Sequence, residues 1–178
     1  MKRLIMCEGP NELTLINILL ENDALVFSED DLLGLTAYHA RQINTNAQVR
    51  LALNMYFGND VMLMRIGDKQ TERLIIPPDY REKICEIRKY CTLPELEMLL
   101  IISEGMVKDF EKVKSTVRPK VFAKQYIRCN RRRYDNSSQF YRDYYGRDCD
   151  RLINAIREYK RIRGSHKKDE CYLADLLK

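Results

Sequence analysis

Residues 2–12 of the chain read KRLIMCEGPNE, a hydrophobic run that ends abruptly in an acid and a glycine. A helical pattern of apolar residues follows at once, with a proline where the first turn of a helix tolerates it. This order predicts a buried parallel strand over residues 3–7, a tight turn at Gly9 and an amphipathic helix over residues 10–22. Because open α/β sheets bind ligands at the carboxyl ends of their strands, Glu8 is placed to hold a divalent metal or to move a proton. The alternative is that Glu8 only complements the positive end of the helix.

A second hydrophobic run, over residues 61–66, also ends in a glycine and an acid. Between the two runs, the pattern predicts a short strand over residues 24–27 and a helix over residues 46–57. Strands separated by a helix in this way indicate βαβ units, in which the carboxyl ends of parallel strands share one edge of the sheet. Carboxylates at that edge are ligands of the kind that Mg²⁺ takes. The acids expected there are Glu8, Asp68 and either Glu12 or Glu72.

The remaining sequence is expected to be mainly helical. Residues 74–76 predict an edge strand that two prolines stop. Apolar periodicity then predicts further helices over residues 79–90, 94–103, 107–114 and 148–162.

Composition indicates an ordered protein. The chain has 178 residues, of which 45% are hydrophobic, so it can bury a sizeable core. No segment approaches the roughly 18 consecutive apolar residues of a membrane span, and no signal peptide is recognisable, so we expect a cytoplasmic protein that does not contact the membrane. The six cysteines have no CxxC spacing and the two histidines stand apart from them, which disfavours a zinc site.

Charge divides the chain into two parts. Residues 118–178 hold 17 Lys plus Arg against 8 Asp plus Glu, whereas residues 1–117 hold the remaining 14 basic and 18 acidic residues. This asymmetry predicts an acidic-leaning α/β domain over residues 1–117 and a basic helical extension over residues 118–178 that meets a polyanion.

Tyrosines and arginines interleave in this basic extension, which contains seven of the eleven tyrosines. Arginine binds phosphate through a planar fork and tyrosine stacks on bases, so the mixture suits nucleic acid, particularly unpaired strands. The alternative is a solvated helical face with half-buried tyrosines. The basic residues expected to contact nucleic acid are Lys69, Arg118, Lys120, Lys124, Arg128, Arg131, Arg132 and Arg133.

The run LIMCEG at residues 4–9 resembles the first motif of the Toprim domain, a family of topoisomerase and primase catalytic domains, OLD-type nucleases and small nucleases of phage-defence systems. In that family the Glu of this motif acts as a general acid or base, and a later Asp-x-Asp binds metal. Asp68 matches the first acid of the later motif, whereas Gln70 stands where the second is expected. Either Glu72 substitutes for that acid or the site is degenerate.

Residues 93–98, LPELEM, resemble the acidic helix start found late in several small Toprim-like defence proteins, where an acid faces the same site. Here that acid is either Glu95 or Glu97, and the alternative is that both only complement the helix dipole. The metal ligands that the resemblance implies are Glu8, Asp68, Glu72 and Glu95.

The resemblance implies a small parallel Toprim-like sheet flanked by helices. It also implies a Mg²⁺- or Mn²⁺-dependent nuclease acting on DNA or RNA, with Glu8 as acid or base and Asp68 as main metal ligand. The implied setting is a bacterial antiviral-defence or mobile-element system with a partner ATPase or another defence-complex subunit. The alternative is a catalytically degenerate Toprim-like subunit that binds nucleic acid or assembles a larger complex.

Overall fold

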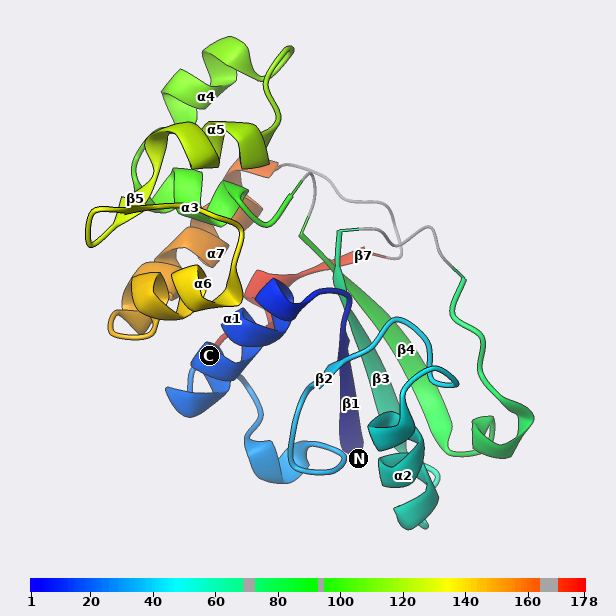
Figure 1. Ribbon diagram of the computed structural model, residues 1–178. Coiled ribbons are helices and arrows are strands. Elements are labelled where there is room, and N and C mark those ends of the chain that lie inside the picture. The colour runs from blue at the N-terminus through cyan, green and yellow to red at the C-terminus, as the bar shows by residue number, and fades with distance from the viewer. Residues whose placement is uncertain (69–72, 93–94, 164–169) are drawn as a thin grey trace.

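A parallel β-sheet forms the centre of the computed structural model, which describes residues 1–68, 73–92, 95–163 and 170–178 (Figure 1). Within these residues the sheet has five strands in the order β2-β1-β3-β4-β7, and every neighbouring pair is parallel. The α/β class predicted from the sequence is therefore confirmed. The strands are β1 (Lys2–Cys7), β2 (Tyr38–His39), β3 (Val61–Gly67), β4 (Ile84–Cys91) and β7 (Glu170–Tyr172).

Strands β1 and β3 pair along their whole length, from Lys2 opposite Val61 to Cys7 opposite Ile66. All seven residues of β3 are buried. Continuous apolar runs of this kind are expected where both faces of a parallel sheet are covered.

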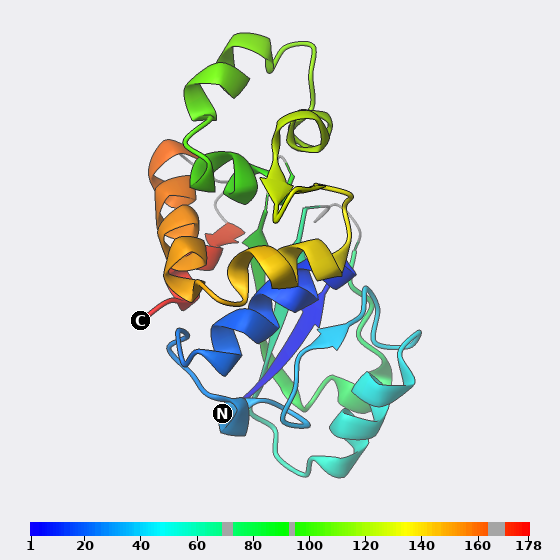
Figure 2. The same ribbon diagram turned by 60° about the vertical axis from the view of Figure 1, so that its left-hand side comes forward.

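Helices cover the two faces of the sheet separately (Figures 1 and 2). On one face, Ile5 and Met64 belong to a large core shared with α1 (Pro10–Glu21) and the later helices. On the other face, Leu4 and Leu63 pack in a smaller core with α2 (Ala47–Met55). The Asn46 side chain caps α2 by accepting a hydrogen bond from the N–H of Val49 at 3.0 Å.

The later helices gather at one side of the sheet. They are α3 (Met98–Ser103), α4 (Val107–Val113), α5 (Pro119–Tyr126), α6 (Ser138–Tyr145) and α7 (Cys149–Arg163), with a small hairpin of β5 (Arg128–Cys129) and β6 (Arg132–Arg133). Short 3₁₀ turns are η1 (Glu29–Asp31), η2 (Pro78–Tyr80) and η3 (Leu173–Leu176). Within the described residues, no helix has the length and apolar character needed to cross a membrane.

Three of the predicted elements are wrong. Where a helix was expected over residues 79–90, the chain forms the end of η2 and then strand β4, which begins at Ile84, and residues 24–27 and 74–76 lie outside the strands. The first part of β4 resembles a helix in sequence because its residues from Ile84 to Lys89 are exposed or half-buried, so polar and apolar side chains mix there instead of forming a buried apolar run. Leu25 is buried but makes only an isolated bridge to Leu177.

The basic extension packs into the same core as the preceding residues. Strand β7 extends the sheet beyond β4, α6 packs against α1, and α7 packs against α3. Residue 117 therefore marks a change in charge, and the packing continues across it. Of the seven tyrosines in the extension, five are buried: Tyr134, Tyr141, Tyr144, Tyr145 and Tyr159.

Burial of these tyrosines makes a testable prediction about stability. Tyr145 is 0% exposed, and its ring lies 4.7 Å from that of Tyr144, so Tyr145→Ala is expected to cost roughly 3–5 kcal/mol of unfolding free energy. Tyr126 is 47% exposed, and Tyr126→Ala, the matched control, is expected to cost about 1 kcal/mol or less. Urea unfolding of both variants measures the difference. Equal costs would contradict the assignment of Tyr145 to the core.

Candidate active site

The candidate site lies where β1 and β3 end side by side. The connection after β1 leads through α1 to β2 on one side, and the connection after β2 leads through α2 back to β3 on the other side. This reversal is a topological switch point, and it opens a crevice outside the carboxyl ends of the two strands. The predicted acids Glu8 and Asp68 follow these two strands directly, so the structure brings them to the same edge.

Glu8 lies against the end of β3. Its backbone N–H donates to the carbonyl of Ile66 at 2.8 Å, which extends the pairing of the two strands by one residue. A Cβ atom added at Gly67 would lie 2.5 Å from Oε2 of Glu8 and 2.6 Å from its Cβ. Gly67 therefore allows the close approach that leaves the Glu8 side chain only 12% exposed.

An arginine accompanies Glu8. Nη2 of Arg41 lies 3.8 Å from Oε1 of Glu8, and Nε of Arg41 donates to the Glu8 carbonyl at 3.3 Å. The loop that carries Arg41 is fixed by a hydrogen bond from the N–H of Ala40 to the carbonyl of Cys7 at 3.0 Å. Arg41 thus places a positive charge beside the Glu8 carboxylate.

Glu12, in the first turn of α1, is the most strongly perturbed acid of the site. Its carboxylate folds back over Gly9, where an added Cβ atom would lie 2.6 Å from Oε2. Burial raises the pKa of Glu12 to about 7, and the negative charges of Asp68, Glu8 and Glu97 act in the same direction. A hydrogen bond to the backbone N–H of Glu12 opposes this shift. The carboxyl group of Glu12 therefore exchanges its proton near neutral pH.

The two acids that precede α3 have structural partners. Oε2 of Glu95 accepts a hydrogen bond from the N–H of Lys120 at 2.8 Å, in the first turn of α5. Glu97 is 5% exposed, burial raises its pKa, and its Oε1 accepts a hydrogen bond from the Tyr134 hydroxyl at 2.7 Å. Glu95 was predicted as a metal ligand, whereas Glu97 is the one whose charge acts on Glu12.

Hydrogen bonds attach the basic extension to the candidate site. Asn11, next to Glu12 in α1, donates through Nδ2 to Oδ1 of Asn136 at 3.3 Å, and the hydroxyl of Ser138 donates to Oδ1 of Asn11 at 3.1 Å. The Tyr134 hydroxyl also lies 3.0 Å from Oδ1 of Asn136. The first turn of α1 is thus held from the side of α6. This link could not be predicted from the sequence, because Asn11 and Asn136 are far apart along the chain.

The predicted nucleic-acid contacts lie mostly on an exposed surface. Arg118, Lys120 and Lys124 belong to the start and body of α5, and Lys120 is half-buried while the other two are exposed. The arginines of the β5–β6 hairpin are exposed, and Arg132 pairs with Asp135 and Asp143. The predicted stacking of tyrosines on bases is wrong for the five buried tyrosines. Lys69, Gln70 and Glu72 lie outside the described residues.

Glu8, Glu12 and Asp68 lie near one another but do not form a complete set of metal ligands. Among residues 1–68, 73–92, 95–163 and 170–178, no group of three or more His, Cys, Asp or Glu side chains has the arrangement of a metal site. All candidate donors here are carboxylate oxygens, which suits a hard cation. Mg²⁺ commonly takes only one or two protein carboxylates and completes its shell with water and substrate phosphate.

Comparison with protein-family models, curated proteins and solved structures finds no match to the chain. The functional argument therefore depends on the geometry of the site.

The raised pKa of Glu12 predicts how stability depends on pH. The folded state binds this proton more tightly than the unfolded chain, so wild-type stability is fully present below the ordinary pKa of 4.5 and falls as the pH rises to about 7. Glu12→Gln is expected to stabilise the protein above pH 7, by at most roughly 3 kcal/mol, and to change little near pH 4. Thermal unfolding of both proteins across this range tests the prediction. A difference that does not vary with pH would contradict it.

The contact between Gly67 and Glu8 predicts a second effect. Gly67→Ala is expected to displace Glu8 and to cost roughly 1–3 kcal/mol of unfolding free energy, because the new Cβ overlaps two Glu8 atoms. In a Glu8→Gly background both obstructing atoms are gone, and the added cost is expected to fall below about 1 kcal/mol. Denaturant unfolding of the four proteins in this cycle measures the coupling, and additive costs would argue against the contact.

Proposed function

We propose that this chain is a Toprim-like, divalent-metal-dependent nuclease that hydrolyses phosphodiester bonds in DNA or RNA. The observation that carries the proposal is the gathering of Glu8, Glu12 and Asp68 at the switch point between β1 and β3. The parallel sheet and the order of its elements are compatible with a Toprim-like fold.

The donor chemistry fits the metal that the resemblance implies. Glu8 and Asp68 would hold Mg²⁺ or Mn²⁺, and Glu72 is proposed as a further ligand from the sequence alone. The bound ion would supply a Lewis acid that polarises the scissile phosphate and lowers the pKa of an attacking water. Glu95 is a weaker candidate for this role, because its carboxylate already accepts the hydrogen bond from Lys120.

Glu8 and Glu12 are the residues proposed to move protons. Glu8 would accept a proton from water, and Arg41, which contacts both its carboxylate and its carbonyl, would orient it. Glu12 has a pKa of about 7 and can hold a proton or release it at neutral pH, which suits it to protonate a leaving oxygen. Gly67 and Gly9 position these two carboxyl groups by leaving room for them.

Exposed cations beside the site would bind the substrate backbone. Arg118 and Lys124 on α5 and Arg128, Arg131 and Arg133 on the hairpin lie on the surface of the protein. Contacts between such side chains and phosphates give affinity without reading sequence, and they weaken steeply with salt. The proposed setting, antiviral defence beside a partner ATPase, follows from the resemblance alone.

A second candidate function is a catalytically degenerate subunit that binds nucleic acid or assembles a larger complex. Two observations favour it: Gln70 stands where a second metal-binding acid is expected, and Arg41 already contributes a positive charge beside Glu8. In this case the acidic edge is retained for structure and the exposed cations alone carry the function.

A cleavage assay separates the two candidates. Wild type, Glu8→Gln, Glu12→Gln and Asp68→Asn are compared on labelled single-stranded RNA, tRNA, and single- and double-stranded DNA with Mg²⁺ or Mn²⁺. We expect metal-dependent cleavage that each substitution lowers by roughly 100-fold or more, as for loss of a general acid or base. Glu29→Gln, which changes an exposed acid in η1, is the matched control and is expected to cleave like wild type.

Binding without cleavage would support the second candidate. In that result wild type and the three site variants bind nucleic acid with the same steep dependence on salt, and added metal changes neither their affinity nor the integrity of the nucleic acid. Cleavage that persists in Asp68→Asn and Glu8→Gln would place the chemistry elsewhere and contradict the proposed site.

A further inference from the structure

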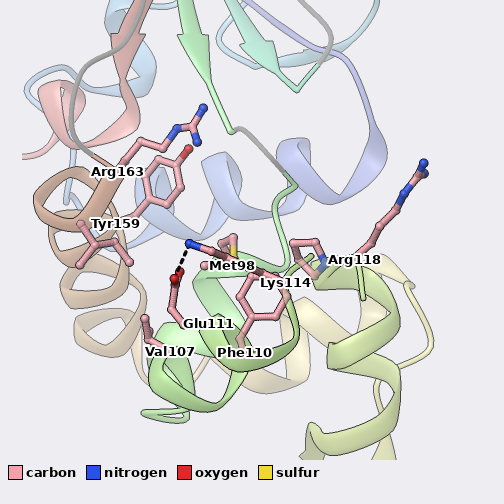
Figure 3. A pocket seen from close by; sticks show the side chains of 10 residues that line it. Met98, Val107, Phe110, Glu111, Lys114, Arg118, Tyr159 and Arg163 are labelled. Carbon is pink, nitrogen blue, oxygen red and sulfur yellow. Dashed lines mark ion pairs between the residues drawn. The ribbon is translucent and has the colours of Figure 1, made fainter. Parts of the chain in front are cut away.

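A cavity of about 680 Å³ lies among α3, α4, α5 and α7, apart from the acidic site (Figure 3). Its volume is in the range of pockets that take small organic ligands. The residues that line it are Met98, Val107, Phe110, Glu111, Lys114, Arg118, Pro119, Tyr159, Ile162 and Arg163.

The inner wall of the cavity is apolar and firmly packed. Phe110, Met98 and Tyr159 contribute to it, and each of these side chains is otherwise buried in the large core. The ring of Phe110 packs edge-on against Phe122, with centroids 5.4 Å apart. A flat apolar ring can therefore lie against this wall without rearranging it.

The rim of the cavity is cationic. Figure 3 shows Arg163 and Arg118 on opposite sides and Lys114 between them. Glu111 is the one acid among the described lining residues, and it pairs with Lys114. The two arginines have no ion-pair partner within the described part of the chain, so the rim carries two uncompensated positive charges.

The cavity opens near the same edge of the sheet as the acidic site. Glu95 follows β4 and bonds to the first turn of α5, where Arg118 and Pro119 begin the cavity wall. Tyr159 also borders a small gap beside Cys91, the last residue of β4. The end of β4 and the Glu95 segment thus connect the sheet edge to the wall of the cavity.

We infer that the cavity binds one unpaired nucleotide of the substrate strand, an assignment that rests on the proposed nuclease function. The base and sugar fill the apolar part, and the phosphates on the two sides of the nucleotide meet Arg118 and Arg163, whose planar guanidinium groups suit phosphate oxygens. A base inside a duplex is stacked and paired and cannot enter such a cavity. The substrate class is therefore single-stranded nucleic acid, or a duplex with an unpaired nucleotide.

Binding is measured in EDTA, so that cleavage plays no part. The probes are fluorescein-labelled dT12 and rU12, the corresponding 12-base-pair duplex, and AMP as competitor. The variants are Arg118→Gln/Arg163→Gln, which removes the two rim charges, and Ile162→Trp, which fills the cavity from a side chain that is 38% exposed and so tolerates enlargement. Lys108→Gln, an exposed position on α4 outside the lining, is the matched control.

We expect single strands to bind at least roughly tenfold more tightly than the duplex, and AMP to compete with them. Loss of two charge-assisted contacts is expected to weaken binding by roughly tenfold or more, and Ile162→Trp to abolish competition by AMP. Lys108→Gln is expected to bind as wild type does. Circular dichroism and thermal unfolding confirm that each variant is folded.

Three results would overturn the inference: equal affinity for duplex and single strands, competition by AMP that survives Ile162→Trp, or competition by decanoate but not by AMP. The last result would assign the cavity to another class of anionic apolar ligand. Metal-dependent cleavage by wild type and Asp68→Asn, measured as described above, tests the catalytic site without reference to the cavity. Failure of the cavity and failure of the catalytic site are thereby measured separately.

Discussion

The parallel pairing of β1 with β3 is the constraint on which the rest of the structure depends. The two strands are hydrogen-bonded from Lys2 and Val61 to Cys7 and Ile66, and both are buried by packing on both faces. Because each strand is followed at once by polar residues, this register sets Glu8 against Gly67 and brings Asp68 to the same edge. A shift of one residue would send every core side chain to the opposite face, so the apolar pattern that stabilises the sheet also fixes the geometry of the acids.

The sequence allows the central part of the fold to be predicted because its signals are local. The apolar run before Glu8 is uninterrupted and the run before Asp68 contains one charged residue, Arg65, and the turn and helix that follow the first run have their own composition signals. Strand β4 could not be predicted in the same way. Its residues from Ile84 to Lys89 are exposed or half-buried, so they show no apolar run, and its second neighbour in the sheet, β7, comes much later in the chain. Leu25 was misassigned because it makes only an isolated bridge to Leu177 rather than pairing within a strand.

The residues of the candidate site could likewise be predicted only where their signal is local in the sequence. Glu8 and Asp68 could be predicted because position relative to a strand is visible in the sequence. The distinctive state of Glu12 could not, because it arises from burial beneath neighbouring elements and from acids on three other segments. The tyrosines show the opposite error: charge around them indicated a surface, whereas their rings pack against one another, as Tyr134 and Tyr141 do at 5.8 Å. Exposed arginines over buried aromatic rings have the same amino-acid composition as a surface that stacks on bases, so composition alone does not distinguish the two.

The late position of β7 in the chain affects how fast the sheet is completed during folding. Strand β4 pairs with β7 (Glu170–Tyr172), which follows α7 in the chain. This pairing therefore joins segments that are widely separated in sequence. Folding of such non-local parallel pairs is slow, because the entropy of closing a long loop is lost before the contacts form. During that interval the outer edge of β4 presents free backbone groups to other chains. Glu86 and Arg88 lie on the part of β4 that β7 does not pair with, so their charges oppose edge-to-edge association both during folding and in the folded protein.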